Sequence, residues 1–391
     1  MGILMSRGLS EPAVPKARRR SRSRTRTVVW LVLIGVAVLG VIFLARRSNP
    51  LPASPVDLSI SRDGKVAAAL VGGLSLGMSG GEKASVVLLD PASREVTKSF
   101  DVDPSNTAIE PDPTGQYLVA LGETASVYEV RSGKLLDSID LTGDTAAAAF
   151  TEDGKNLVLL DTYLEDAESG GQFVTNTQGK VLIAETTTGS IIHSVQAQGG
   201  PTSVIVEGDS AYVAQRLSDV SVATNPDTLE YEYDVTGLGG QIGQLKVSSA
   251  TPVQTTTIPD SVTTAEFGLD LVRSSRMAVG DFWIVDGEQL IELKQDGAGS
   301  PFGPTRTAVG SASGKWIAYV DSESEDSQIV IVDTESGASR PLGNEPLGIV
   351  YALEFDAAEQ QLIVANDVDG LTPRLTFLDL QSGETIGTVG G

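Results

Sequence analysis

A short pattern of apolar strand residues followed by a polar turn recurs along this chain and restricts what it can fold into. Its clearest copy is Ile329–Ala338, IVIVDTESGA, in which β-branched residues favour a buried strand and Asp-Thr-Glu-Ser-Gly supplies the turn. The other copies are Val86–Ser93, Ala125–Gly133, Val181–Gly189 and Leu375–Gly383, with weaker ones at Gly243–Ala250 and Gln289–Gly297. Seven copies predict a repeat protein.

A hairpin signature precedes most copies of this pattern. In Leu58–Ala68, LSISRDGKVAA, an alternating segment leads through an Asp-Gly turn into a second apolar segment, which is typical of a β-hairpin. The same unit recurs at Ala108–Val119, Ala148–Leu159, Ser203–Val213, Ala308–Tyr319 and Tyr351–Val364, and in a degenerate form around 265–279. One repeat therefore has four strands.

Repeat starts near 57, 107, 147, 202, 265, 307 and 350 define seven such units. The sequence thus predicts an all-β fold, a seven-bladed β-propeller with four-stranded antiparallel blades. The alternative, an extended β-solenoid, would have much shorter repeats without regular Asp-Gly hairpins.

The strand-and-turn pattern resembles the bacterial YVTN/WD40-like propeller repeats. Ile329–Ala338 matches the core of that repeat best, and Tyr212–Gln215 and Ile363–Asn366 match the strand that precedes it. The resemblance covers residues 57–389, but the Gly-His and Trp-Asp signatures of true WD repeats are missing. It implies the propeller fold and leaves the function open, because such propellers include lactonase-like enzymes, surface-layer proteins and pure scaffolds.

An apolar segment near the N-terminus predicts a membrane anchor. Val28–Ala45 is eighteen residues without a charge, which is long enough for a transmembrane helix. The preceding basic residues, among them Arg18, Arg19 and Arg20, place the N-terminus in the cytoplasm, and Trp30 suits an interfacial anchor.

The predicted organisation has four parts. Residues 1–27 form a disordered basic cytoplasmic tail, 28–45 an uncleaved signal-anchor helix, 46–56 a Pro-rich linker and 57–389 an extracytoplasmic propeller. A cleavable signal peptide is the alternative, but the apolar run is long for one, and Phe43 stands where a small residue should precede cleavage after Ala45.

Charge and composition exclude several functions. Residues 1–47 carry a net charge of +9, and the remainder carries −32, which together give the −23 of the whole chain. So acidic a body repels nucleic acid. The absence of cysteine excludes disulfides and thiolate chemistry, and the single histidine, His193, is interpreted as an ordinary strand side chain. No catalytic motif of the G-x-S-x-G, H-E-x-x-H or P-loop type is present, which favours a non-enzymatic role and leaves the question of an enzyme open.

The longest loops are acidic and follow the second strand of their repeats, so we expect them on one face of the propeller. Variable loops on a rigid scaffold commonly carry function. The candidate partner-binding residues are Asp161, Glu165, Asp166, Glu168, Asp227, Glu230, Tyr231, Tyr233 and Asp234. Leu229–Val235 alternates, which fits either a hairpin extension of the blade or exposed tyrosines on a contact surface.

A calcium site is a further hypothesis, since Asp367 and Asp369 belong to an EF-hand-like fragment, although it lacks the final Glu ligand. No other cofactor is expected. The predicted function is that of a single-pass protein of a bacterial cell envelope, whose propeller serves as an interaction scaffold or auxiliary subunit of a membrane complex. The alternative is a lactonase-like or glycan-acting hydrolase with a carboxylate or metal site on the same face.

Overall fold

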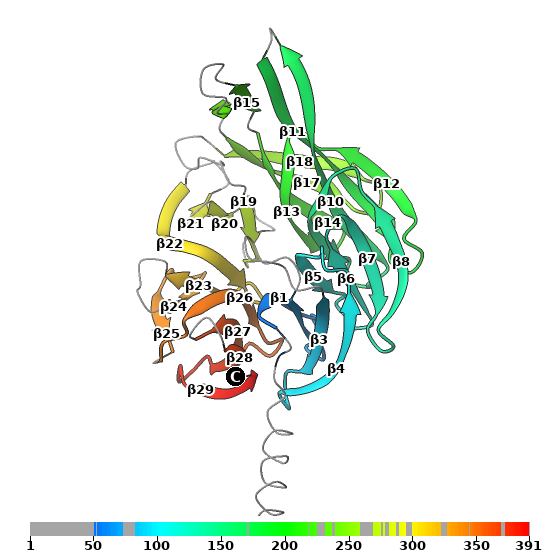
Figure 1. The fold of residues 1–391 in the computed structure, drawn as a ribbon. Helices are drawn as coiled ribbons and strands as arrows, with labels where there is room; N and C mark the ends of the chain where they lie inside the picture. The colour runs from blue at the N-terminus through cyan, green and yellow to red at the C-terminus, as the bar shows by residue number, and fades with distance from the viewer. Residues whose placement is uncertain are drawn as a thin grey trace, which may run out of the picture. The chain divides into compact units, whose positions relative to one another are not determined.

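The Asp-Gly hairpin expected from the sequence is the first hairpin of the described residues (Figure 1). Strands β1 (Pro55–Ile60) and β2 (Ala67–Gly72) pair antiparallel. In the turn between them, the Asp63 carboxylate accepts hydrogen bonds from Ser61 Oγ (2.8 Å) and Lys65 N (3.1 Å). Gly64 has a φ of 69°, a left-handed conformation that favours glycine. The turn chemistry therefore fixes the register of the hairpin.

The structure, a computed structural model, describes residues 51, 53–72, 83–169, 172–217, 219–224, 231–236, 239–258, 269–274, 277, 281–286, 289–294, 299–321, 327–343, 345–368 and 372–390. Within these residues there is no helix with the length and apolar character needed to cross a bilayer. The predicted anchor at 28–45, the basic tail and most of the linker lie outside the described residues.

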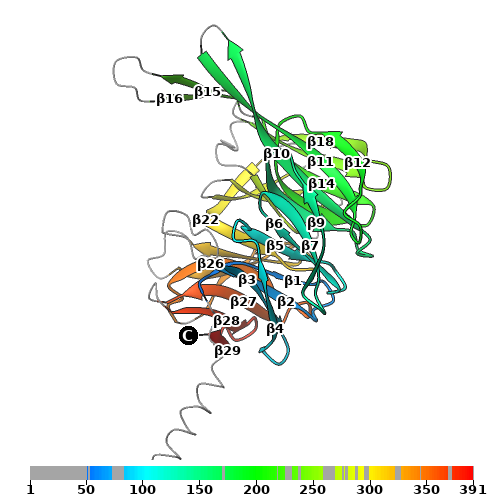
Figure 2. The same ribbon diagram turned by 45° about the vertical axis from the view of Figure 1, so that its right-hand side comes forward.

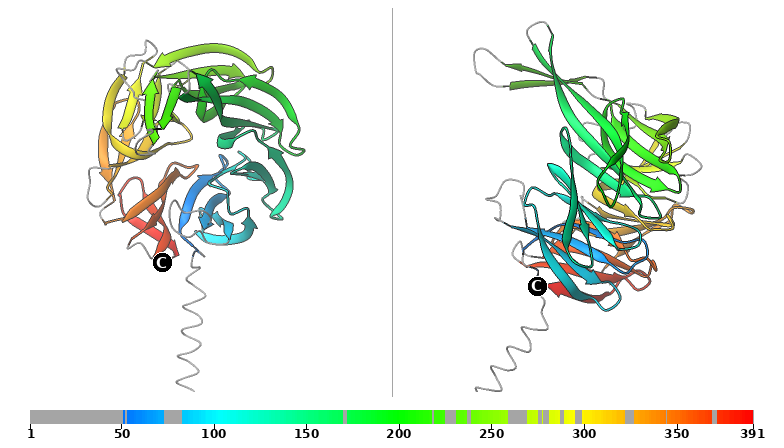
Figure 3. Two further views of the ribbon diagram at one scale, coloured as in Figure 1. Left: turned by 45° about the horizontal axis from the view of Figure 1, so that its top comes forward. Right: turned by 90° about the vertical axis from the view of Figure 1, so that its right-hand side faces the viewer.

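Seven blades, each built on four antiparallel strands, follow one another around a central axis (Figure 3, left). Blade 1 adds β3 (Ala84–Asp90) and β4 (Glu95–Val102) to β1 and β2. Blade 2 consists of β5 (Ala108–Pro111), β6 (Tyr117–Leu121), β7 (Thr124–Glu129) and β8 (Lys134–Asp140). Blade 3 consists of β9 (Asp144–Phe150), β10 (Asn156–Ser169), β11 (Gln172–Glu185) and β12 (Ile191–Gln196).

The remaining blades follow the same plan, and the first strand of each lies nearest the axis. Blade 4 consists of β13 (Gly200–Glu207), β14 (Ser210–Arg216), β17 (Gly240–Lys246) and β18 (Thr251–Ile258). Blade 5 has β19 (Leu269–Val272), β20 (Phe282–Asp286), β21 (Gln289–Leu293) and the first half of β22 (Gly299–Gly310), whose second half opens blade 6. Blade 6 continues with β23 (Trp316–Asp321), β24 (Ile329–Asp333) and β25 (Ser339–Leu342). Blade 7 consists of β26 (Ile349–Phe355), β27 (Gln361–Asp367), β28 (Pro373–Asp379) and β29 (Thr385–Gly390). The predicted seven-bladed propeller is confirmed.

The acidic residue that ends the repeat pattern shapes the turn between the third and fourth strands. Asp333 Oδ1 accepts hydrogen bonds from the backbone N–H groups of Glu335 (3.1 Å) and Ser336 (2.8 Å). Asp379 makes the same contacts with Gln381 and Ser382 in blade 7. These bonds lower the pKa of both aspartates. The recurring aspartates of the pattern are therefore turn caps.

The core consists of seven apolar clusters, one at each interface between adjacent blades. Between blades 1 and 2, for example, Leu70 and Val86 pack with Leu118, and all three are fully buried. Each sheet thus buries both faces against its neighbours, as expected of a repeat fold in which every repeat contacts only the adjacent ones.

The ring closes where blade 1 packs against blade 7, an interface called here the seam. Each of these two blades is built from four consecutive strands, so no strand is shared across the seam. Leu89 of β3 and Phe377 of β28 belong to its buried cluster. The guanidinium of Arg94 lies 5.7 Å from the centre of the Phe377 ring and donates from Nη1 to the Ile386 carbonyl (2.6 Å). Apolar packing and a few polar contacts therefore close the propeller.

Candidate functional site

The largest departure from the blade pattern is an extension beyond the ring, called here the acidic arm (Figure 2). Strands β10 and β11 pair along their whole length, from Asn156–Glu185 to Ser169–Gln172. The insertion of blade 4 forms a second hairpin, β15 (Asp219–Thr224) and β16 (Tyr231–Thr236). Strand β15 pairs with the outer part of β11, so the two insertions form one sheet in the order β16-β15-β11-β10. The arm thus joins insertions from two adjacent blades.

Most of the predicted partner-binding residues fall on this arm. Three are on β10, namely Glu165, Asp166 and Glu168, and three are on β16, namely Tyr231, Tyr233 and Asp234. Asp227 and Glu230 lie outside the described residues. Of the two interpretations of Leu229–Val235, the structure shows the hairpin for residues 231–236, and that hairpin joins the sheet of blade 3.

Asp161 has a different position from its predicted companions. It is only 2% exposed, and its Oδ1 accepts hydrogen bonds from the backbone N–H groups of Thr142 (3.0 Å) and Gly143 (3.0 Å). The carboxylate therefore stabilises the connection between blades 2 and 3 and does not belong to an exposed face.

Replacing Asp161 by alanine is expected to lower the free energy of unfolding by about 1–3 kcal/mol, because two backbone donors lose their partner. Urea denaturation of the full chain in mild detergent measures this change. The matched control is Asp140→Ala, at an exposed position on β8, which we expect to change stability by less than about 0.5 kcal/mol. Equal effects of the two substitutions would contradict a capping role.

The hypothetical calcium ligand Asp367 is also engaged within the fold. It is 1% exposed, and its Oδ1 accepts a hydrogen bond from Thr372 N (2.9 Å). Asp369 lies outside the described residues. Among the side chains that the structure describes, no three from His, Cys, Asp and Glu are close enough to hold a metal ion.

The first strands of all seven blades line a hollow in the middle of the ring. The part of it nearer the turns between first and second strands forms a cavity of about 270 Å³. Apolar side chains such as Phe150, Leu271 and Phe355 share its wall with the carboxyl groups of Glu110 and Glu354. Residues from all seven blades thus converge on one site.

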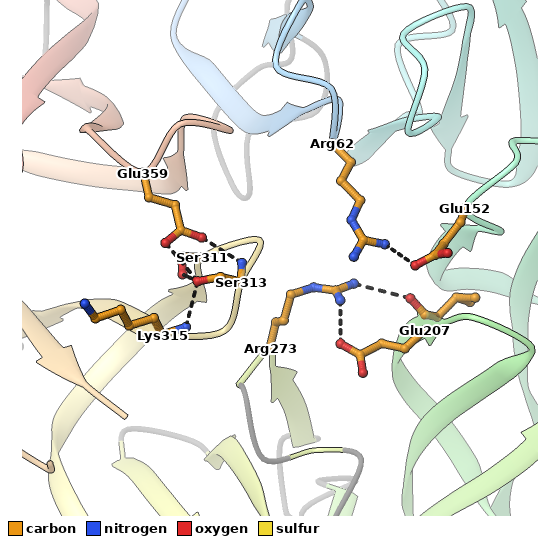
Figure 4. Close-up of polar contacts among 9 residues, drawn as sticks. Arg62, Glu152, Glu207, Arg273, Ser311, Ser313, Lys315 and Glu359 are labelled. Carbon is orange, nitrogen blue, oxygen red and sulfur yellow. Dashed lines mark hydrogen bonds and ion pairs between the residues drawn. The ribbon is translucent and has the colours of Figure 1, made fainter. Parts of the chain in front are cut away.

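Two ion pairs lie at the mouth of this cavity (Figure 4). Arg62 Nη1 is 2.6 Å from Glu152 Oε1, which links blade 1 to blade 3 across the mouth. Arg273 Nη1 is 2.7 Å from Glu207 Oε1, linking blades 5 and 4. Both arginines are thus already paired with a carboxylate.

Further carboxylates lie closer to the middle of the first strands, and among the described residues no arginine or lysine is within ion-pair distance of them. The Asp57 carboxylate accepts from Ile109 N (2.8 Å), and the Glu110 carboxylate accepts from Ser59 Oγ (2.8 Å), so these contacts join blades 1 and 2. Glu110 and Glu354 are half-buried, and both line the cavity, so the surrounding protein still desolvates them.

Burial raises the pKa values of these carboxyl groups. It raises the pKa of Glu110 to about 7 and that of Asp57 to about 6. The pKa of Glu354 lies well above its usual value, first because of burial and then because of the negative charges of Glu110 and Asp57. A carboxyl cluster of this kind marks a candidate functional site.

Sequence reasoning did not single out these carboxyl groups. Glu110 and Glu354 each stand two residues before the first residue of a hairpin turn, Asp112 or Asp356, and Ser59 holds the same place before Ser61. A polar residue at the same position of several first strands, two residues before the turn, was therefore the sequence pattern that could have indicated a polar site near the axis. His193 lies on β12, the outermost strand of blade 3, and does not line the cavity.

The fold and its axial cavity place the chain in the class of seven-bladed β-propellers. The structure resembles the β-propeller domain of Cps50 (Swd1) from Myceliophteria thermophila, with a TM-score of 0.52 and 12% sequence identity over 82% of this chain and 95% of that one. It is also similar to hydrazine synthase from Kuenenia stuttgartiensis, with a TM-score of 0.42 and 16% identity over 85% and 78% of the two chains. No family model and no curated protein matches the sequence. Likenesses at such low identity show the fold alone.

Proposed function

We propose that this chain is a membrane-anchored, extracytoplasmic binding protein whose acidic arm docks a basic partner protein in a bacterial envelope complex. Residues 28–45 would hold it in the membrane, and the ring would serve as a rigid base for the arm. The repeats would belong to the YVTN-like group that their strand-and-turn pattern resembles.

The observation that carries this proposal is the joining of two acidic insertions into one sheet. Residues 162–179 and 219–236 together contain eight Asp and Glu residues, three in the first range and five in the second, and neither Lys nor Arg. The pairing of β15 with β11 brings these two ranges side by side. None of the seven blade interfaces needs the arm, since each has its own apolar cluster. A protruding surface of one charge sign speeds encounter with a partner of the opposite sign and contributes to specificity.

Site-specific photo-crosslinking in the native membrane tests this proposal. A photoreactive amino acid at position 166, on the arm, is expected to form a defined adduct with one protein. The same probe at position 335, in an exposed turn of blade 6, is the matched control and should form none. The triple variant E165K/D166K/E168K should abolish the adduct from a probe placed at position 233.

Equal labelling from positions 166 and 335 would contradict docking through the arm. Turnover of a lactone or glycan by the purified chain, retained in the triple variant, would favour the hydrolase alternative instead.

A further inference from the structure

Carboxyl groups outnumber basic groups around the axial cavity. Its two arginines, Arg62 and Arg273, are each within 2.7 Å of a glutamate oxygen, and Arg273 also interacts with Glu110 and Glu354 at longer range. Glu110 and Glu354 line the same cavity, and Asp57 is close enough to Glu354 to affect its ionisation. A ligand that ionises these carboxyl groups must therefore bring its own positive charge, since the arginines at the mouth are already engaged.

The cavity wall distinguishes between kinds of cation. A bare metal ion needs several carboxylate oxygens at short range, and no three acidic side chains among the described residues are close enough together. The wall also carries apolar groups, including Ile60, Leu271 and Phe355. An organic cation suits both features, because its carbon atoms pack on the apolar wall while its charged group pairs with a carboxylate.

We propose that the axial cavity binds a small organic ammonium ion, with the ammonium group held by Glu110 and Glu354 and the carbon chain packed on the apolar wall. The two ion pairs at the mouth position the ring of first strands around this ligand. The site lies near the turns between first and second strands, whereas the arm extends from the connection between second and third strands, so the inference does not depend on the proposed docking function.

Isothermal titration calorimetry of the full chain in mild detergent, with 1,4-diaminobutane as the probe, tests the proposal. We expect saturable binding of the diamine and none of butane-1,4-diol, a neutral molecule of the same length. Glu354→Gln and Glu110→Gln, which remove the charge and keep the shape, should each weaken binding at least tenfold. Because both substitutions remove a poorly solvated carboxyl group, the variants should remain folded, as circular dichroism can verify.

Two controls separate the cavity from the acidic surface. Glu335→Gln removes an exposed carboxylate, and E165Q/D166N/E168Q removes those of the arm, and neither should change the affinity for the diamine. Unchanged binding in Glu354→Gln would overturn the proposal, as would the absence of any binding. Calcium chloride that displaces the diamine and stabilises the chain equally would also overturn it, by showing a metal site instead.

Discussion

Replacing Phe377 by alanine is expected to lower the free energy of unfolding by about 3–5 kcal/mol, the range typical of a buried aromatic residue. The Phe377 side chain is completely buried in the seam and supports Arg94 from the opposite blade. Its loss would leave a cavity at the only blade interface that joins the two ends of the ring. Because no strand is shared across this interface, no strand pairing holds the two blades together when the packing is lost.

Urea denaturation of the full chain, followed by tryptophan fluorescence, measures the effect. The matched control is Phe100→Ala, since Phe100 is a half-buried ring of β4 that stacks on Tyr128 away from the seam. We expect this control to cost about 1–2 kcal/mol. A Phe377→Ala variant as stable as the Phe100→Ala variant would show that the seam contributes little to closure.

The second large effect concerns pH. The pKa of Glu110 is raised from 4.5 to about 7 in the folded chain, because burial disfavours the charged form. The folded state therefore holds this proton more tightly than the unfolded state does. Its contribution to stability is fully present below pH 4.5 and is lost as the pH rises through about 7. Glu354 acts in the same direction, since its pKa is also raised.

Glu110→Gln should flatten this pH dependence. At pH 8 the variant is expected to be more stable than the wild type by about 2 kcal/mol. This value is smaller than the pKa shift alone would give, because Glu110 is only half-buried and solvent weakens the effect. At pH 4.5 the two should be equally stable. Groups that face Glu110 are Ser59 and Asp57 on β1, Arg273 beyond β19, and Glu354 on β26.

Urea denaturation at pH values from 4.5 to 8 checks this expectation. Glu335→Gln, at an exposed turn, provides the control and should follow the wild-type curve throughout. A Glu110→Gln variant that is less stable than the wild type at pH 8 would mean that the carboxylate form is favoured in the folded chain.

The fold could be predicted because its determinants are local and repeated. Turn residues such as Asp63 and Asp333 form hydrogen bonds with backbone groups only two residues away. Each copy of the pattern therefore specifies its own turn without help from the rest of the chain. The fifth unit has the weakest copy of the pattern, with Arg273-Ser274-Ser275 in place of the Asp-Gly turn. There β19 is only four residues long, Leu269–Val272, and it is held to blade 4 by hydrogen bonds such as the one that Leu271 N donates to Ser203 Oγ (3.1 Å).

The candidate site could be predicted only in part, because its determinants are long-range. Acidic loops identified Glu165 and Asp166 on the arm, but the pairing of β15 with a strand of another blade is a tertiary event. Asp161 resembled these residues in sequence, yet it is buried as a cap. The convergence of Glu110 and Glu354 follows from ring closure, which brings together positions more than two hundred residues apart.

The seam has a mechanical consequence. Leu51, at the start of the described ring, and Val389, near its end, pack in the same apolar cluster. Tension applied between these two points would pass directly across the seam and would not travel around the other six blade interfaces. The propeller would then open at the seam before any blade unfolded. The force needed would depend on the contacts of Phe377 and Arg94.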